Sequence, residues 1–176
     1  MSRTLSSLVL GAGMLVLAAC ASGDADKETM MEVDAAVPPA VQKLYADVPG
    51  ASEMGAKAKG ILVFPSITKA GVGIGGEYGE GALMVDGKIV DYYTTSTASL
   101  GLQLGVEERS EVLMFMTDEA LASFRDGSGW EAGVDGNVTV IDTAAAGQIN
   151  TDTLQDPVVG FIYGQSGLMG GVSLEG

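Results

Sequence analysis

The stretch that decides the fold is GVGIGGEYGEGALMVDGKIVDYY, residues 71–93. Glycine recurs here through an otherwise apolar run, which is typical of strands that bulge, bend or approach another backbone closely. Asp86-Gly87 is a strong signal for a two-residue turn between antiparallel strands, and Ile89–Tyr93 supplies the returning strand. The stretch therefore predicts a hairpin with a glycine-rich first strand.

More strands are predicted on both sides of this hairpin. Residues 60–64 form an apolar run that ends at Pro65, which predicts a buried strand. Short apolar runs with turn residues between them predict further strands at 100–106, 112–116, 138–141, 158–163 and 168–174. Consecutive strands joined by short turns favour an antiparallel sheet.

Helices are predicted at three places. Pro38 and Pro39 open a stretch whose apolar residues up to Val48 follow helical spacing, and a second short helix is predicted at 52–58. Thr117 is a good N-cap for a third helix that ends before Gly127. With 26 glycines, 6% aromatic residues and 176 residues in all, we predict one α+β domain. Its core would be a mainly antiparallel, glycine-rich curved sheet, either a sandwich or a half-barrel, with a few short helices.

The first twenty residues resemble an export signal with a lipid attachment site. One positive charge at Arg3 precedes an apolar run at 8–17, which is too short to span a membrane as a helix. Leu17-Ala18-Ala19-Cys20 matches the lipobox of bacterial lipoproteins, and Cys20 is the only cysteine in the chain. We therefore expect residues 1–19 to be a signal peptide and Cys20 to be acylated. The alternative is an ordinary cleavage site with a cysteine there by coincidence.

The predicted organisation continues from Cys20. Residues 20–37 are expected to be a lipidated N-terminus and a flexible acidic tether, because the stretch is small, acidic and without a sustained period. Residues 38–176 are expected to form the domain. Ala21 and Ser22 stand where an inner-membrane retention signal usually has Asp, which favours the outer membrane, with the protein facing the periplasm.

Charge and composition exclude several classes of function. The net charge of −14 argues against a nucleic acid partner and against strong attraction to anionic headgroups. The chain has no histidine, which removes the common triads and zinc sites. Gly71-x-Gly73-x-x-Gly76 fits the dinucleotide fingerprint, but strand rather than helix is predicted after it. We therefore expect no catalytic residues, no metal and no cofactor.

Four ordered motifs carry a family resemblance. They are AKGILVFP at 58–65 with KAG at 69–71 and GGEYGEG at 75–81, then GLQLG at 101–105, VLMFMT at 112–117, and GGVSLEG at 170–176. In this order they resemble the SYLF-domain family, also called the Ysc84-type actin- and lipid-binding domain. We assign a structural role to the matching positions, which are Gly60, Phe64, Pro65, Lys69, Gly71, Gly75, Gly76, Gly79, Gly81, Gly101, Gly105, Gly171, Ser173 and Glu175.

The resemblance implies a non-catalytic domain associated with membranes. Eukaryotic relatives bind phosphoinositides and actin, and bacterial relatives are exported lipoproteins. Family members often carry Arg and Lys before the closing motif, whereas residues 164–169 have none, so phosphoinositide recognition is not expected here. The leading hypothesis is an envelope lipoprotein whose domain binds lipid or another apolar ligand. The alternative is a protein-interaction scaffold at the outer membrane, with an envelope protein as its partner.

Two structural features would separate these hypotheses. A large apolar cavity would favour carriage of a lipid, since ligand pockets are concave and mostly apolar. A flat exposed apolar patch would favour a protein partner.

Overall fold

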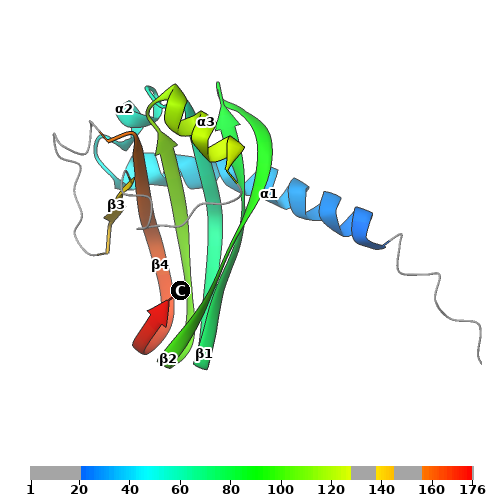
Figure 1. Ribbon diagram of the computed structural model, residues 1–176, viewed down its shortest axis with the longest axis vertical. Helices are drawn as coiled ribbons and strands as arrows, with labels where there is room; N and C mark the ends of the chain where they lie inside the picture. The colour runs from blue at the N-terminus through cyan, green and yellow to red at the C-terminus, as the bar shows by residue number, and fades with distance from the viewer. Residues whose placement is uncertain (1–20, 128–137, 145–155, 176) are drawn as a thin grey trace, which may run out of the picture.

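The computed structural model describes residues 21–127, 138–144 and 156–175, so the predicted signal peptide and Cys20 lie outside the described residues. The elements are α1 (Ala21–Asp47), α2 (Ala51–Gly55), β1 (Gly60–Val85), β2 (Lys88–Phe115), α3 (Asp118–Asp126), β3 (Val138–Asp142) and β4 (Val158–Glu175). The four strands form one sheet in the order β1-β2-β4-β3. Among the strands that the structure describes, β3 alone runs parallel to its neighbour, β4. The predicted α+β class with a mainly antiparallel, curved and unclosed sheet is confirmed (Figure 1).

The strands are much longer than the sequence pattern suggested. β1 continues through Pro65, with an irregularity of register between Phe64 and Ile67, and β2 joins three stretches that were predicted as separate strands. β1 lies at the edge of the sheet, and Pro65 falls within the irregular stretch between Phe64 and Ile67. Its missing N–H therefore interrupts no regular part of the hydrogen-bond ladder. The Ser110 hydroxyl donates to the Pro65 carbonyl oxygen across 2.8 Å. Pro65 therefore distorts the strand without ending it.

The predicted hairpin turn is present between β1 and β2. Asp86 and Gly87 have φ angles of 52° and 73°, and Val85 pairs with Lys88 across the turn. Two successive positive φ angles are the conformation that two-residue hairpins require, because this turn matches the twist of the strands. Asp86-Gly87 is confirmed as the hairpin turn.

The long hairpin folds back on itself near residue 73. A Cβ atom placed on Gly79 would lie 2.7 Å from Cγ1 of Ile67, and one on Gly81 would lie 2.6 Å from Cδ1 of Phe64. Residues near 80 therefore face residues near 65 of the same strand. We call residues 60–72 with 104–115 the first arm and residues 74–85 with 88–100 the second arm. Figure 1 shows β1 and β2 curving through the lower end of the view between these arms.

Helix α1 corrects the prediction of a flexible tether. It begins at Ala21 rather than at Pro38, and it contains both Pro38 and Pro39. Val33 and Val37 are buried in the same cluster as Leu44, so the helical face extends further towards the N-terminus than was predicted. Burial of this face against the sheet offsets the backbone hydrogen bonds that the two prolines remove. The second helix, predicted at 52–58, is α2.

The core consists of two clusters on opposite faces of the first arm. The outer cluster packs α1 and α2 on the sheet through Val63, Val112 and Phe161. Tyr163 joins them, because its buried hydroxyl donates to the Ala40 carbonyl oxygen at 2.7 Å, and burial raises its pKa to about 12. The inner cluster lies between the two arms.

The inner cluster ends under α3. It contains Phe64, Ile67, Leu83 and Leu113, and Phe124 of α3 packs against it. The Thr117 side chain accepts a hydrogen bond from the backbone N–H of Ala120 at 3.1 Å, as predicted for an N-cap. Both arms and α3 therefore enclose one apolar interior at the end of the molecule that carries the hairpin turn.

Gly81→Ala tests the close approach of the two arms. The added Cβ would meet the Val63 carbonyl oxygen and the Phe64 ring, so we expect the free energy of unfolding to fall by about 1–3 kcal/mol. Gly160→Ala is the matched control, because its Cβ would find its nearest neighbour, Cγ2 of Val140, at 3.5 Å. Denaturant unfolding of both variants measures the difference, and equal stability would contradict the fold-back.

Candidate functional site: the bent end of the sheet

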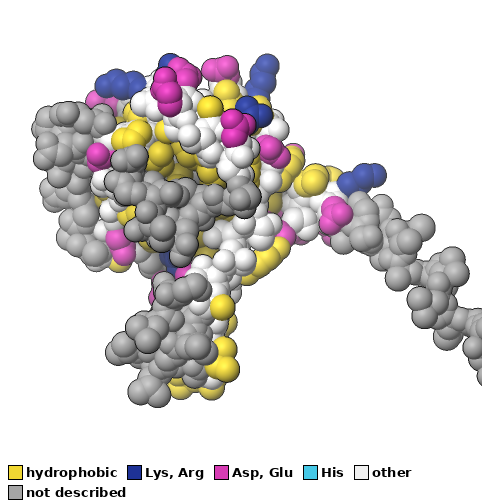
Figure 2. Space-filling model, viewed as in Figure 1, with side chains coloured by type: hydrophobic (Ala, Val, Ile, Leu, Met, Phe, Trp, Pro, Cys, Tyr) yellow, Lys and Arg dark blue, Asp and Glu magenta, His cyan; other side chains and the backbone are white. Residues whose placement is uncertain are grey.

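Apolar side chains are exposed where the sheet bends. Val72 pairs with Leu104 and Val106 pairs with Leu168, so residues from β1, β2 and β4 share the outer face. Their exposed fractions are high, from 54% for Val106 to 90% for Leu168. We define the bent end by the side chains of Val72, Ile74, Leu104, Val106 and Leu168. Figure 2 shows hydrophobic side chains at the lower end of the molecule, below the main body.

Charged side chains lie inside the sheet next to the bent end. Arg109 on the first arm contacts Glu77 on the second arm, and its other terminal nitrogen lies 4.0 Å from Glu111. The exposed fractions of these side chains are only 18%, 7% and 15%. We call Glu77, Arg109 and Glu111 the cross-arm ion group. The group joins the two arms at the point where the apolar interior ends.

Burial shapes the electrostatics of the cross-arm ion group. The pKa of Glu111 is raised, first by burial and also by the nearby charge of Glu77, while Arg109 lowers it. Oε2 of Glu77 and Nε of Arg109 are buried without a hydrogen-bond partner, although Glu77 and Arg109 are in direct contact. The Arg109 guanidinium thus contacts one buried carboxylate and lies near a second, and a buried ion pair of this kind depends on both partners.

The bent end has an inverted distribution of polarity. The odd-numbered residues of β2 from Arg109 to Phe115 face inward, and the exposed even-numbered residues Leu104 and Val106 face outward. Near α3 the inward side chains are apolar, and near the bend they are charged. A water-soluble sheet normally buries its apolar face and exposes its charges. The bent end does the reverse.

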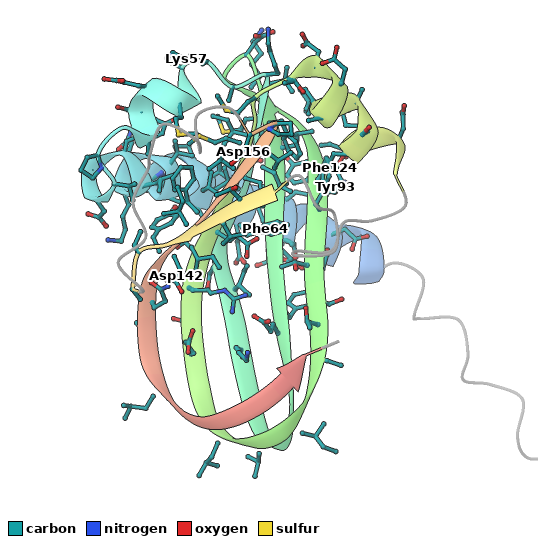
Figure 3. All side chains as sticks on the ribbon, turned by 60° about the vertical axis from the view of Figure 1, so that its left-hand side comes forward. Lys57, Phe64, Tyr93, Phe124, Asp142 and Asp156 are labelled. Carbon is teal, nitrogen blue, oxygen red and sulfur yellow. The ribbon has the colours of Figure 1, made fainter. Side chains whose placement is uncertain are left out.

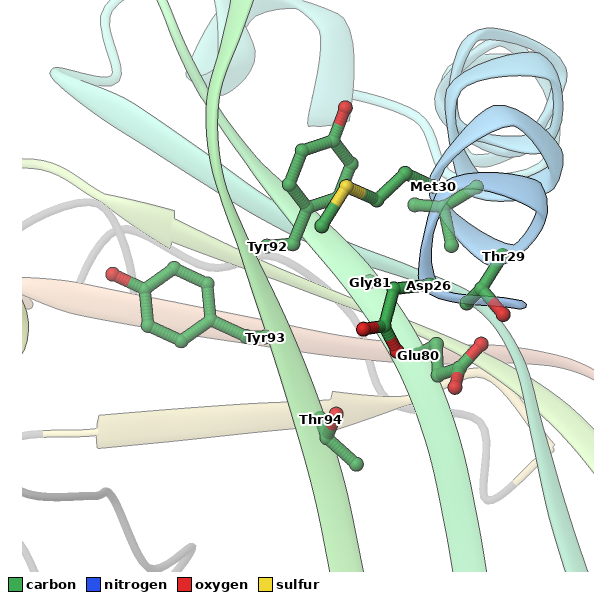
Figure 4. Close-up of a pocket in the computed structure, with 9 residues that line it drawn as sticks. Asp26, Thr29, Met30, Glu80, Gly81, Tyr92, Tyr93 and Thr94 are labelled. Carbon is green, nitrogen blue, oxygen red and sulfur yellow. The ribbon is translucent and has the colours of Figure 1, made fainter. Parts of the chain in front are cut away.

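A shallow groove lies between α1 and the second arm. It has a volume of about 190 Å³ and is lined by Asp26, Thr29, Met30, Val33, Glu80, Gly81, Tyr92, Tyr93 and Thr94 (Figure 4). The Tyr92 hydroxyl donates to Asp34 of α1 at 2.7 Å. Typical ligand pockets are larger and mostly apolar. The groove therefore lacks the size and lining expected for carriage of a lipid.

The cationic side chains do not gather at the bent end. Lys57 lies at the opposite end of the molecule, near α2 (Figure 3), and Lys59 lies 3.6 Å from Asp118. Lys69 is the cross-strand partner of Glu107. These three lysines therefore do not form one cationic face around the apolar side chains.

The structure places many family-motif residues around the bend. Gly71 pairs with Gly105, Gly101 pairs with Ser173, and Gln103 pairs with Gly171. Motifs far apart in the sequence thus meet on three neighbouring strands. Gly105 has a φ angle of 140°, a conformation that glycine adopts without strain. Gly60 and Phe64 lie at the other end of the first arm, where a Cβ on Gly60 would lie 2.7 Å from Leu121.

Sequence reasoning missed the cross-arm ion group. Its signal was present, because Arg109 and Glu111 fall in the same alternation as the apolar residues Leu113 and Phe115. A charge on the buried face of a strand needs a partner. That the partner is Glu77 could not be inferred, because it depends on the fold-back.

Within residues 21–127, 138–144 and 156–175, no group of three or more possible acidic or sulfur ligands could hold a metal ion. Asp142 accepts hydrogen bonds from the Ala144 N–H at 2.8 Å and from Gln165 at 2.7 Å, as a turn residue does. No helix in the part of the chain that the structure describes is long and apolar enough to cross a membrane.

The fold and the bent end define a class of α+β domain built on one folded, unclosed sheet with an exposed apolar surface. Residues 96–176 match the model of the Ysc84 family, described as "Las17-binding protein actin regulator". This match supports assignment to the SYLF-domain family. It includes the motifs at 101–105, 112–117 and 170–176, whereas the motifs at 58–81 precede it. No curated protein matches the chain.

Arg109→Gln tests the cross-arm ion group. The substitution leaves Glu77 and Glu111 buried without their guanidinium, so we expect the free energy of unfolding to fall by about 3 kcal/mol. Adding Glu77→Gln should restore part of that loss, because it removes one uncompensated charge. Lys43→Gln is the control, since the Lys43–Asp47 pair is exposed and contributes less than about 0.5 kcal/mol. Equal effects at Arg109 and Lys43 would contradict a buried role.

Proposed function

We propose that this chain is an envelope lipoprotein, acylated at Cys20 in the outer membrane, whose SYLF-like domain binds lipid without catalysis. The observation that carries this proposal is the bent end, where aliphatic side chains are exposed on a strongly acidic protein. Contiguous apolar surface that is exposed to water usually marks a site of contact with a protein or a membrane. The family match at residues 96–176 is consistent with a binding role.

The geometry favours binding at a membrane surface over carriage of a lipid. The groove beside α1 is small and carries the carboxylates of Asp26 and Glu80, so it suits an acyl chain poorly. The exposed apolar residues lie on the outside of a bend. We therefore place lipid contact at the bent end and keep a protein-interaction scaffold as the second candidate, since an exposed apolar patch also suits a protein partner.

The proposal of membrane attachment through Cys20 is based on the lipobox, residues 17–20, which directly precedes α1. Several acyl chains give firm anchoring, because each buried methylene contributes roughly 0.8 kcal/mol and one chain alone is marginal. Since α1 begins at Ala21, the lipidated residue would join a helix that packs on the sheet. The helix would then hold the domain at a restricted distance from the membrane, with little slack between anchor and sheet.

Cys20→Ser tests the anchor. We expect the variant to take up no fatty-acid probe during metabolic labelling and to remain uncleaved or be released from the membrane, because Cys20 is the only thiol of the chain. Ser22→Ala is the control, since it leaves the thiol in place. A Cys20→Ser protein that still takes up the probe would remove the basis of the proposed localisation.

Vesicle flotation tests lipid binding by the domain itself. We expect residues 20–176 carrying Cys20→Ser to bind neutral vesicles weakly. The binding should be equal at low and high salt, because salt screens interactions between charges and not apolar contacts. Anionic vesicles should bind still less, because the net charge is negative. Tight binding to acidic vesicles that weakens with salt would contradict apolar contact and mean that cationic side chains of the domain bind the headgroups.

A further inference from the structure

We infer that the bent end is a membrane-inserting edge, whose aliphatic side chains enter the apolar layer of a neutral bilayer. The inference rests on the proposed lipid-binding function and names the surface and the lipid chemistry. Its starting point is the inverted polarity at the bend, where Val72, Leu104 and Leu168 face outward and the cross-arm ion group faces inward. This arrangement is costly in water and suits an apolar surrounding.

The chain carries no charge in the three segments that meet at the bend. Residues 70–76, 97–106 and 164–174 contain no Asp, Glu, Lys or Arg, although the protein has 23 acidic and nine basic residues. A charged side chain would oppose entry into a bilayer, whereas an uncharged surface enters without that desolvation cost. The lack of cationic residues also means that no anionic headgroup is recruited. The chemistry therefore fits a neutral, zwitterionic lipid surface.

The backbone at the bend is largely hydrogen bonded within the sheet. β2 lies between two strands here, with Leu104 paired to Val72 on one side and to Gly170 on the other. Polar backbone groups must be satisfied before they enter an apolar layer. β1 and the end of β4 carry open edges, so the insertion that we infer is shallow, with the side chains in the apolar layer and the edges at the level of the headgroups.

A protein partner fits the same surface less well. The cores of protein interfaces are enriched in aromatic residues, Met and Arg, whereas the exposed apolar side chains that the structure describes at the bent end are Val, Ile and Leu. Tyr78, which is 53% exposed, lies beside it and donates a hydrogen bond to Glu80 at 2.5 Å. An amphipathic tyrosine at the border of an aliphatic surface is typical of the membrane interface.

The test uses a single fluorescent label on the full chain. In the acylated protein the Cys20 thiol is blocked, so Leu168→Cys provides the only reactive thiol for an environment-sensitive dye. Val90→Cys is the matched control, because Val90 is an exposed aliphatic residue next to the hairpin turn, at the other end of the molecule. Each labelled protein is reconstituted into phosphatidylcholine vesicles with or without brominated acyl chains.

The inference predicts a shift to shorter emission wavelength and quenching by brominated chains at position 168, with neither change at position 90. Adding Leu104→Asp should abolish both signals while leaving the protein on the vesicle. Emission at position 168 that stays as in water overturns the insertion, even if the acyl chains hold the protein on the membrane. If Cys20 is not acylated, its thiol stays free to react with the dye. Mass spectrometry would then show a second dye on Cys20 in place of acyl chains, which separates a failed anchor from a failed insertion.

Discussion

The close approach of residues 79–81 to residues 63–67 is the constraint on which the rest of the structure depends. Gly79 and Gly81 leave no room for a side chain against Ile67 and Phe64, so one strand can lie across itself as two arms. This contact encloses the inner apolar cluster under α3. It also creates the bend near residue 73, and with it the surface that we regard as functional.

The fold-back explains why charges lie inside and apolar side chains outside at one end only. Near α3 the two arms are separated by Phe64, Leu83 and Leu113. Towards the bend, Glu77 and Arg109 hold the arms together by an ion pair. Helix α1 packs on the other end of the sheet, in the cluster that contains Val63, Val112 and Phe161, and Val72, Leu104 and Leu168 stay exposed at the bend. The end of the molecule that carries the hairpin turn therefore buries its apolar side chains, whereas the end at the bend exposes them.

Helix α1 connects this surface to the proposed anchor. The expected tether is replaced by a helix that is packed through Val33 and Val37, so an acyl group on Cys20 would hold the domain at a restricted distance from the membrane. Such an anchor raises the local concentration of a weak binding surface. A weakly inserting bent end would then suffice, although the overall charge of −14 opposes adsorption to anionic lipid.

Local patterns in the sequence predicted the parts of the fold that depend on neighbouring residues. The Asp86-Gly87 turn, the Thr117 cap and the α+β class follow from turn chemistry, capping and composition. The continuity of β1 through Pro65 was missed, because a proline in an edge strand looks like a strand end. The start of α1 was missed, because its burial depends on the sheet. The Glu77–Arg109 contact joins distant segments through the fold-back, so no local pattern could reveal it.

Hydrogen–deuterium exchange of the acylated protein, with and without phosphatidylcholine vesicles, tests the central claim most directly. If the fold-back presents the bent end to lipid, vesicles should slow exchange in peptides that cover residues 70–76 and 99–106. Peptides around the hairpin turn and α3 should exchange as they do without vesicles. Slower exchange confined to α1 and residues 80–94, with none at the bend, would contradict the account and place the contact at the groove beside α1.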